Sequence, residues 1–263
     1  MILKDIIKHI ERIAPINLKE DFDNVGLMVG SNKSDIKNIL VALDCTKDVI
    51  DEAKSINADL ILTHHPLIFR KPSSITDNTL LGSKIIELIK SDINVYSAHT
   101  NLDSARDGIN DRIAKVLEYK TCKIMSKCSE DKECGVGRFI ELQSEFNLEE
   151  IINIFKTKLN IKNLRYTGQL KDRVTKIAII NGSGQDFFEK AKVLGAELIV
   201  TGDTTYHFVS DYTEMGIDII DLGHFNSEWP IFVEIIKELE SKIDNRNIKF
   251  HYSKTSKEPY NFI

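Results

Sequence analysis

The chain contains one arrangement of elements twice, and this duplication restricts the folds that it can adopt. Residues 37–65 read KNILVALDCTKDVIDEAKSINADLILTHH, and residues 176–203 read KIAIINGSGQDFFEKAKVLGAELIVTGD. Each segment predicts an apolar strand, a polar turn, an amphipathic helix and a second apolar strand. The similarity continues in INVYSAHTNLDS, from Ile93, and IDIIDLGHFNSE, from Ile217, which both predict a strand that runs into a His-containing loop. Two βαβ units could resemble each other by chance, but the shared order of several elements favours a duplicated architecture.

Strands that alternate with helices predict parallel sheets with helices on both faces. The apolar runs 60–62 and 198–200 fit strands that are buried on both sides. We therefore predict an α/β fold of two pseudo-symmetric lobes, with parallel or mixed sheets, flanking helices and duplicated βαβ units. The first lobe is expected to comprise residues 1–125 and 225–263, and the second lobe residues 126–224.

The remaining segments complete the two lobes. Residues 122–138 are expected to be less regular, and a charged helix is predicted over residues 147–159. After Pro230, an amphipathic helix over residues 231–243 and a strand over residues 248–252 close the chain. We expect these last two elements to return to the first lobe.

The composition excludes several classes of protein. Of the 263 residues, 42% are hydrophobic and 29% are charged, which is ordinary for a globular protein. The net charge of -5 argues against a nucleic-acid-binding surface, which needs a basic face.

No apolar run approaches membrane-spanning length, and the charged N-terminal segment has no signal region. The four cysteines form no Cys-x-x-Cys pair, so reduced thiols are favoured over a disulfide or a zinc site. We therefore expect a cytoplasmic protein.

Polar side chains follow three of the predicted strands. Ligand sites in parallel α/β sheets form at the carboxyl ends of the strands, where the loops converge. The candidate residues are His64 and His65 after strand 59–63, His99 and Asp103 after strand 95–97, and His224 and Glu228 after strand 217–222.

The histidine doublet is the strongest of these signals. Adjacent residues of a strand point to opposite faces, so His64 and His65 could not share a site if the strand continued. Pro66 ends the strand and favours an extended conformation for His65. Two neighbouring imidazoles at such a bend can reach two nearby metal ions. Two hydrogen-bonded loop histidines are the alternative.

The carboxylates are weaker signals when each is taken alone. Asp103 precedes a predicted helix and could instead cap it. If Ser227 is the N-cap of the last helix, His224 lies in the loop and Glu228 at the helix start, and an ordinary solvated turn is the alternative. Together, three imidazoles and two carboxylates form a nitrogen and oxygen ligand set that suits zinc, iron or manganese.

Other polar residues near strand ends stay without an assigned role. The turn Gly182–Gly184 resembles a phosphate-binding turn, but the third glycine of a dinucleotide fingerprint is missing. Asp203 and His207 follow another strand and are plausible neighbours of a ligand site. Asp44 ends a strand and is a candidate partner for a metal ligand.

The motifs together resemble a known family over essentially the whole chain. They are Phe22-Asp23-Asn24-Val25-Gly26-Leu27, Thr63-His64-His65-Pro66-Leu67-Ile68-Phe69, His99-Thr100-Asn101-Leu102-Asp103, Gly202-Asp203, and Gly223-His224 with Glu228. Their order is similar to that of the NGG-interacting-factor-three-like family, whose bacterial members are called GTP cyclohydrolase I type 2 homologues. The chain has Phe22 where tryptophan is common in that family.

The resemblance implies a dinuclear metal centre, with two divalent ions per chain, and a toroidal homohexamer whose sites face an internal cavity. Longer family members insert a further domain between the lobes, where this chain has only residues 122–138. The implied ligands are His64, His65, Asp103, His224 and Glu228.

The leading hypothesis is a metal-dependent hydrolase that resembles GTP cyclohydrolase I type 2. A metal-activated water would attack a small nucleotide-like substrate, with His99 as a catalytic residue that orients the water or moves a proton. A dinuclear phosphoesterase or amidohydrolase is a related reading. A non-catalytic metal-binding or partner-binding hexameric scaffold is the alternative from another class, because a fold alone does not decide function.

Overall fold

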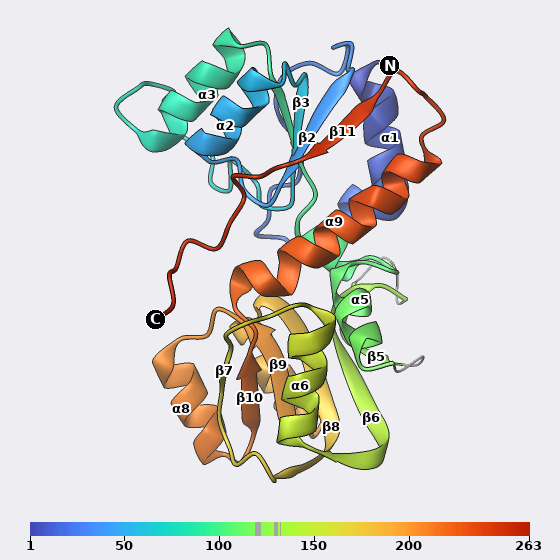
Figure 1. The fold of residues 1–263 in the computed structure, drawn as a ribbon, viewed down its shortest axis with the longest axis vertical. Helices are drawn as coiled ribbons and strands as arrows, with labels where there is room; N and C mark the ends of the chain where they lie inside the picture. The colour runs from blue at the N-terminus through green and yellow to red at the C-terminus, as the bar shows by residue number, and fades with distance from the viewer. Residues whose placement is uncertain (119–121, 129–130, 132) are drawn as a thin grey trace. The chain divides into compact units, whose positions relative to one another are not determined.

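The computed structural model of the chain describes residues 1–118, 122–128, 131 and 133–263, which form two compact units (Figure 1). Each unit is built on one mixed sheet with flanking helices. The predicted lobe bounds stay a prediction, because compact packing does not show which segments fold as independent domains. Unit 1 comprises Met1–Leu102 and Phe232–Lys257, and unit 2 comprises Asp103–Ile231 and Glu258–Ile263.

The sheet of unit 1 has five strands in the order β1-β4-β3-β2-β11. The strands β4, β3, β2 and β11 run parallel to one another, and β1 pairs antiparallel with β4 at one edge. The pairing of β11 with β2 confirms that the last strand returns to the first sheet. The strands are β1 (Gly26–Val29), β2 (Asn38–Ala42), β3 (Leu60–Thr63), β4 (Asn94–Ser97) and β11 (Lys249–Tyr252).

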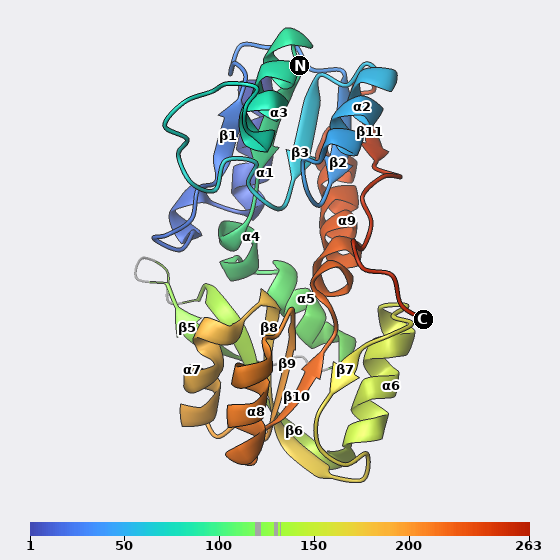
Figure 2. The ribbon, with the colours of Figure 1, turned by 90° about the vertical axis from the view of Figure 1, so that its left-hand side faces the viewer.

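Helices cover both faces of this sheet. Figures 1 and 2 show α2 and α3 on one face, with α1 and the C-terminal part of α9 on the other. The amphipathic pattern explains this docking, since the apolar side chains of α1 recur every three or four residues and are buried. The helices are α1 (Leu3–Ile13), α2 (Lys47–Ser55), α3 (Leu80–Lys90) and α9 (His224–Lys242), with the short segments η1 (Ile16–Leu18) and α4 (Thr100–Ser104).

The sheet of unit 2 has six strands in the order β5-β6-β8-β9-β10-β7. The central strands β8, β9 and β10 are parallel, and the outer pairs are antiparallel. The expectation of a less regular stretch over residues 122–138 is wrong for its described part, because β5 pairs there with the start of β6. The strands are β5 (Lys123–Lys127), β6 (Gly135–Asn147), β7 (Arg165–Tyr166), β8 (Arg173–Ser183), β9 (Leu198–Gly202) and β10 (Asp218–Asp221).

Helix α6 (Leu148–Lys158) of unit 2 begins with a recognisable signal. The predicted helix over residues 147–159 is confirmed as α6, which starts with a capping box between Asn147 and Glu150. Side chains of α7 and α8 pack with the apolar residues of the sheet in one core. The helices are α5 (Ile109–Val116), α6 (Leu148–Lys158), α7 (Phe188–Val193) and α8 (Tyr206–Glu214), with η2 (Gln185–Phe187) before α7.

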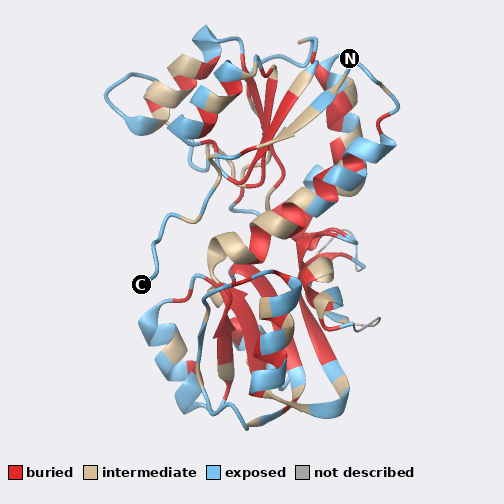
Figure 3. Cartoon of the chain, viewed as in Figure 1, coloured by how far each residue is buried: buried red, intermediate tan, exposed pale blue. Residues whose placement is uncertain are grey.

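The predicted α/β class and the duplication are confirmed. The order β2-α2-β3-α3-β4 in unit 1 is repeated as β8-α7-β9-α8-β10 in unit 2, and the three strands of each set are parallel neighbours. Every residue of β3 and β4 is buried, as expected for central strands with helices on both faces (Figure 3). Among the described residues, no helix combines the length and the apolar composition that crossing a membrane requires.

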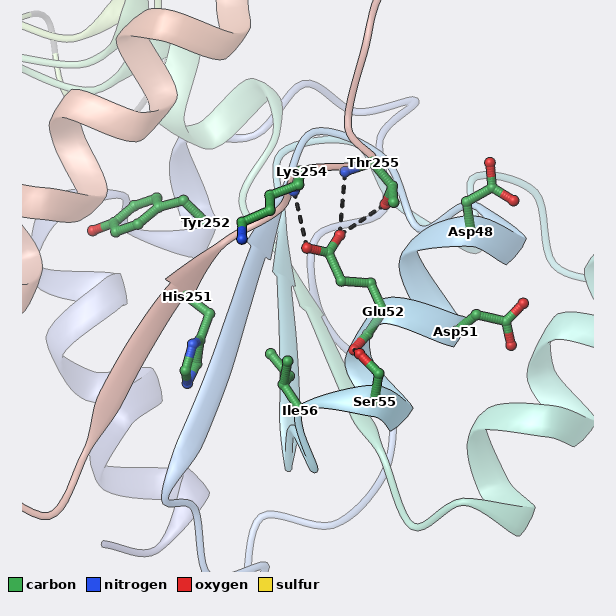
Figure 4. A pocket seen from close by; sticks show the side chains of 9 residues that line it. All are labelled: Asp48, Asp51, Glu52, Ser55, Ile56, His251, Tyr252, Lys254 and Thr255. Atoms are coloured by element: carbon green, nitrogen blue, oxygen red, sulfur yellow. Dashed lines mark hydrogen bonds between the residues drawn. The ribbon is translucent and has the colours of Figure 1, made fainter.

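The segment after β11 is fixed to α2 by one carboxylate. Glu52 accepts hydrogen bonds from the Lys254 backbone N–H at 2.9 Å and from Thr255 Oγ1 at 2.8 Å (Figure 4). It also accepts a hydrogen bond from Ser253 Oγ at 2.6 Å. Burial by itself would raise the pKa of Glu52, but these hydrogen bonds outweigh it and lower the pKa. Glu52, Lys254 and Thr255 are among the residues that line a groove of about 700 Å³ between α2 and the end of β11.

Candidate metal centre

Three imidazoles lie together at the carboxyl ends of β3 and β4 in unit 1. The ring centroids are 5.1 Å apart for His64 and His65, 5.2 Å for His64 and His99, and 5.6 Å for His65 and His99. Each ring offers one nitrogen to a group whose atoms all lie within 4.8 Å of one another. The rings could therefore hold a metal ion.

The sequence places the doublet where the strand stops. β3 ends at Thr63, whose hydroxyl donates to the His65 carbonyl at 2.8 Å and thereby fixes the turn that follows. The Thr63 hydroxyl also lies 2.8 Å from Ser97 Oγ on the neighbouring strand β4. The two strand ends, and hence their histidines, are held together by these contacts.

Each of the three imidazoles is oriented by a hydrogen bond from Nδ1 to an oxygen. A carbonyl or carboxylate oxygen only accepts, so Nδ1 carries the hydrogen and Nε2 of the neutral ring carries the lone pair. Histidine ligands of metal ions usually have such an outer partner, which fixes tautomer and ring direction. The pairs are His64 with the Ala98 carbonyl at 2.8 Å, His65 with Asp44 at 2.8 Å and His99 with Asp23 at 2.9 Å.

Asp23 is a buried anion that holds His99 in place. Besides His99, it accepts from the Thr100 backbone N–H and the Thr100 hydroxyl. Burial by itself would raise the pKa of Asp23, but the hydrogen bonds and the charge of His99 lower the pKa to about 2. The carboxyl group is therefore ionised at neutral pH.

Two buried carboxylates in unit 2 share one donor. Asp103 is 8% exposed and Glu228 is 2% exposed. The side-chain amide of Asn181 donates to Asp103 Oδ1 at 2.9 Å and to Glu228 Oε1 at 3.0 Å. The structure thus brings the two predicted carboxylate ligands to the same amide.

His224 and Glu228 lie on one face of α9. This helix begins at His224, so the expectation that His224 lies in the loop before an N-cap at Ser227 is wrong. The cause is a helical hydrogen bond from the Ser227 backbone N–H to the Gly223 carbonyl at 3.0 Å, one turn earlier than expected. Four residues apart on a helix, the two side chains are neighbours.

The contact between these side chains suits a cation. His224 Nδ1 lies 3.3 Å from Asp203 Oδ2, and His224 Nε2 lies 3.1 Å from Glu228 Oε2. With Nδ1 as the donor to Asp203, the Nε2 lone pair of a neutral ring faces the carboxylate lone pair. A proton or a metal ion between the two atoms removes this repulsion. The donors, imidazole nitrogen in unit 1 and imidazole nitrogen with carboxylate oxygen in unit 2, fit zinc, iron or manganese.

The residues without an assigned role fall into two groups. Asp203 contacts His224. Gly182 lies in β8 and not in the predicted turn, and it contacts the start of α9 through Ser227 Oγ. His207 is exposed on α8 and its ring contacts Tyr206. Asn181 belongs to none of the motifs in the sequence, and its position before Gly-Ser-Gly near the end of an apolar strand was the available signal.

Comparison with known proteins decides the family. The family model described as Duf34/NIF3 (NGG1p interacting factor 3) matches residues 1–259. The chain belongs to this family. A relative from Clostridium perfringens called GTP cyclohydrolase 1 type 2 homolog is 58% identical over 263 residues, with 100% of both chains covered. A relative of the same name from Clostridium acetobutylicum is 50% identical, covering 99% of this chain and 98% of its own.

Solved structures agree with this assignment to Duf34/NIF3. A Bacillus cereus protein related to NIF3 has a TM-score of 0.89 at 25% identity, and the match covers 100% of this chain and 99% of the other. Reduced HcgD from Methanocaldococcus jannaschii has a TM-score of 0.81 at 29% identity, with 96% and 97% covered. The resemblance inferred from the motifs is confirmed.

Proposed function

We propose that this Duf34/NIF3 protein is a hydrolase that depends on divalent metal ions and acts on a small nucleotide-like substrate. The observation that carries the proposal is the group of three imidazoles in unit 1, in which His64 and His65 would be ligands and His99 lies beside them, each with Nδ1–H held by an oxygen. The relatives named GTP cyclohydrolase 1 type 2 homolog support a nucleotide as the substrate class. GTP is therefore the first compound to test.

We propose two divalent ions per chain, zinc, iron or manganese. Five ligands exceed the four of an ordinary tetrahedral ion, which supports a dinuclear centre. When bound, such ions lower the pKa of water towards neutrality and so supply a nucleophile. The proposed ligands are His64, His65, Asp103, His224 and Glu228, the residues implied by the family resemblance.

We propose His99 as the residue that accepts and returns a proton, through Nε2. Asp23 holds the Nδ1 hydrogen of His99 at 2.9 Å and is ionised at neutral pH. An ionised carboxylate in this position fixes the tautomer and stabilises the imidazolium that forms when Nε2 takes a proton. The pair therefore suits reversible proton transfer next to the other two imidazoles.

A partner-binding or metal-storing scaffold is the second candidate. The family description, NGG1p interacting factor 3, names an interaction and not a reaction.

We also propose, from the family resemblance, that the chain assembles as a cytoplasmic homohexamer. Multi-angle light scattering tests the assembly directly, and a monomer at micromolar concentration contradicts it.

Elemental analysis followed by a substrate panel tests the function. Protein purified without added metal is measured for zinc, iron and manganese, and the same sample is incubated with GTP, other nucleotides, phosphoesters and amides. We expect about two metal ions per chain at saturation and hydrolysis of a nucleotide. The variant His99→Ala should keep the metal and lose most of the turnover. A metal-loaded wild-type protein that hydrolyses nothing in the panel would favour the scaffold.

A further inference from the structure

Asn181 lies near the end of β8, and its side chain is almost fully buried. Both partners of its amide, Asp103 Oδ1 and Glu228 Oε1, are carboxylate oxygens. Since carboxylates only accept, the orientation of the amide is determined, with the NH2 group towards both anions. One amide therefore fixes one oxygen of each carboxylate.

The backbone around Asn181 is fixed as well. Its N–H donates to Asn110 Oδ1 at 3.0 Å, and Asn110 Nδ2 donates to the Asp103 carbonyl at 3.2 Å. Asn110 is fully buried on α5. Through Asn110, the main chain at Asp103 and the main chain at Asn181 are held in one rigid arrangement.

The next residue lets the backbone approach Glu228. Gly182 has φ +56°, and a Cβ at this position would lie 2.3 Å from Glu228 Oε1. Its N–H donates to Ser227 Oγ at 3.4 Å. A side chain at this position would therefore require the Glu228 carboxylate to move.

The hydrogen bonds select which oxygen of Glu228 is presented. Asn181 holds Oε1, and Oε2 lies 3.1 Å from His224 Nε2. A neutral amide orients a carboxylate without cancelling its charge, so the full negative charge stays available to a cation.

We propose that Asn181 is a positioning residue for metal binding, which aims the carboxylates of Asp103 and Glu228 at the metal ions. This inference rests on the proposed metal dependence of the protein. Asn181 acts through the two carboxylates and is not itself a ligand. Outer partners of this kind typically contribute a factor of about 10 to 100 in metal affinity.

The test compares the metal affinity of wild type with that of Asn181→Ala and of the nearly isosteric Asn181→Leu. Each protein is titrated with zinc and with cobalt. The visible spectrum of bound cobalt reports the geometry of the ligands. Asn94→Ala is the matched control. Asn94 is buried in unit 1 and makes comparable hydrogen bonds, to Ser31, Ser34 and the Asp59 carbonyl, at the start of β4. Folding of every variant is checked by circular dichroism.

We expect both Asn181 variants to bind metal about 10- to 100-fold more weakly and to give an altered cobalt spectrum. Asn94→Ala should lose stability but keep the wild-type affinity and spectrum. Equal affinity and spectra in wild type and a folded Asn181 variant overturn the inference alone. A wild-type protein that binds no divalent metal overturns the proposed function together with it.

Discussion

Asp59 and Glu197 make the same pair of hydrogen bonds in the two units. Each carboxylate lies directly before a central strand and accepts the backbone N–H groups of two consecutive residues at the preceding parallel strand. The two residues coincide in the repeated sequences ADLILTHH and AELIVTGD. The donors are Lys37 at 2.7 Å and Asn38 at 2.8 Å for Asp59, and Thr175 at 2.7 Å and Lys176 at 3.2 Å for Glu197.

Loss of the Glu197 carboxylate should destabilise the fold. A hydrogen bond to a charged group contributes at most about 1.5–3 kcal/mol to the free energy of unfolding. Because the Glu197 carboxylate is partly exposed, we expect Glu197→Gln to lower the free energy of unfolding by about 1–2 kcal/mol. Burial raises the pKa of Glu197, but the hydrogen bonds from Thr175 and Lys176 outweigh it and lower the pKa. The stabilisation is thus present above the ordinary pKa of 4.5 and is lost as the pH falls through the lower folded value. Urea unfolding of wild type and Glu197→Gln at pH 7 and pH 3.5 checks both statements. The difference in the free energy of unfolding between the two proteins should be smaller at pH 3.5, and a larger difference there contradicts the prediction.

The carboxylate of Glu52 should control the order of the C-terminal segment. We expect Glu52→Ala to cost about 2 kcal/mol, because three different residues after β11 lose a charged acceptor. Backbone amides of Lys254 and Thr255 should exchange hydrogen faster in the variant. Asp51→Ala, on the same helix but paired with exposed Lys54, is the control and should change neither measurement. Unchanged exchange in Glu52→Ala would show that other contacts hold the segment.

Local patterns predicted the parts of the fold and site that depend on neighbours in sequence. The repeat predicted the βαβ order of both units, and His64 with His65 at the end of β3 marked one strand end as a candidate site. The hydrogen-bond partners of the histidines could not be predicted from local patterns. Asp23, for example, contacts His99 although the two residues are 76 positions apart in the chain. The start of α9 was missed because Pro230 is expected in a first helical turn, whereas the structure holds it inside the helix.

Glu228→Gln distinguishes a ligand from a residue that only complements the helix dipole. A dipole contribution is about 0.3–1 kcal/mol and would leave the metal content unchanged. As a ligand, Glu228 supplies an anionic oxygen, and the amide is a poorer donor that leaves two cations with less negative charge between them. We expect lower metal occupancy with the fold retained. Glu118→Gln, whose side chain is 77% exposed and pairs with Lys158, is the control. If calorimetric titration gives both variants the same metal affinity, Glu228 is not a metal ligand.

Gly182→Ala should weaken metal binding although it changes no proposed ligand. The added Cβ would lie 2.3 Å from Glu228 Oε1, so the carboxylate must move away from its hydrogen bond with Asn181. The positive φ of +56° adds backbone strain, typically about 1 kcal/mol, which lowers stability as well.

Gly216→Ala separates the steric effect on Glu228 from the backbone strain. Gly216 also has a positive φ, +81°, but a Cβ there meets nothing within 4 Å. Both variants should therefore lose stability in urea unfolding, because both place an L side chain in the left-handed region, and Gly182→Ala should lose more, because its Cβ also displaces a buried carboxylate. Only Gly182→Ala should bind zinc more weakly, because only its Cβ displaces a carboxylate. If the two variants bind zinc equally well, the close approach of β8 to Glu228 does not contribute to the metal site.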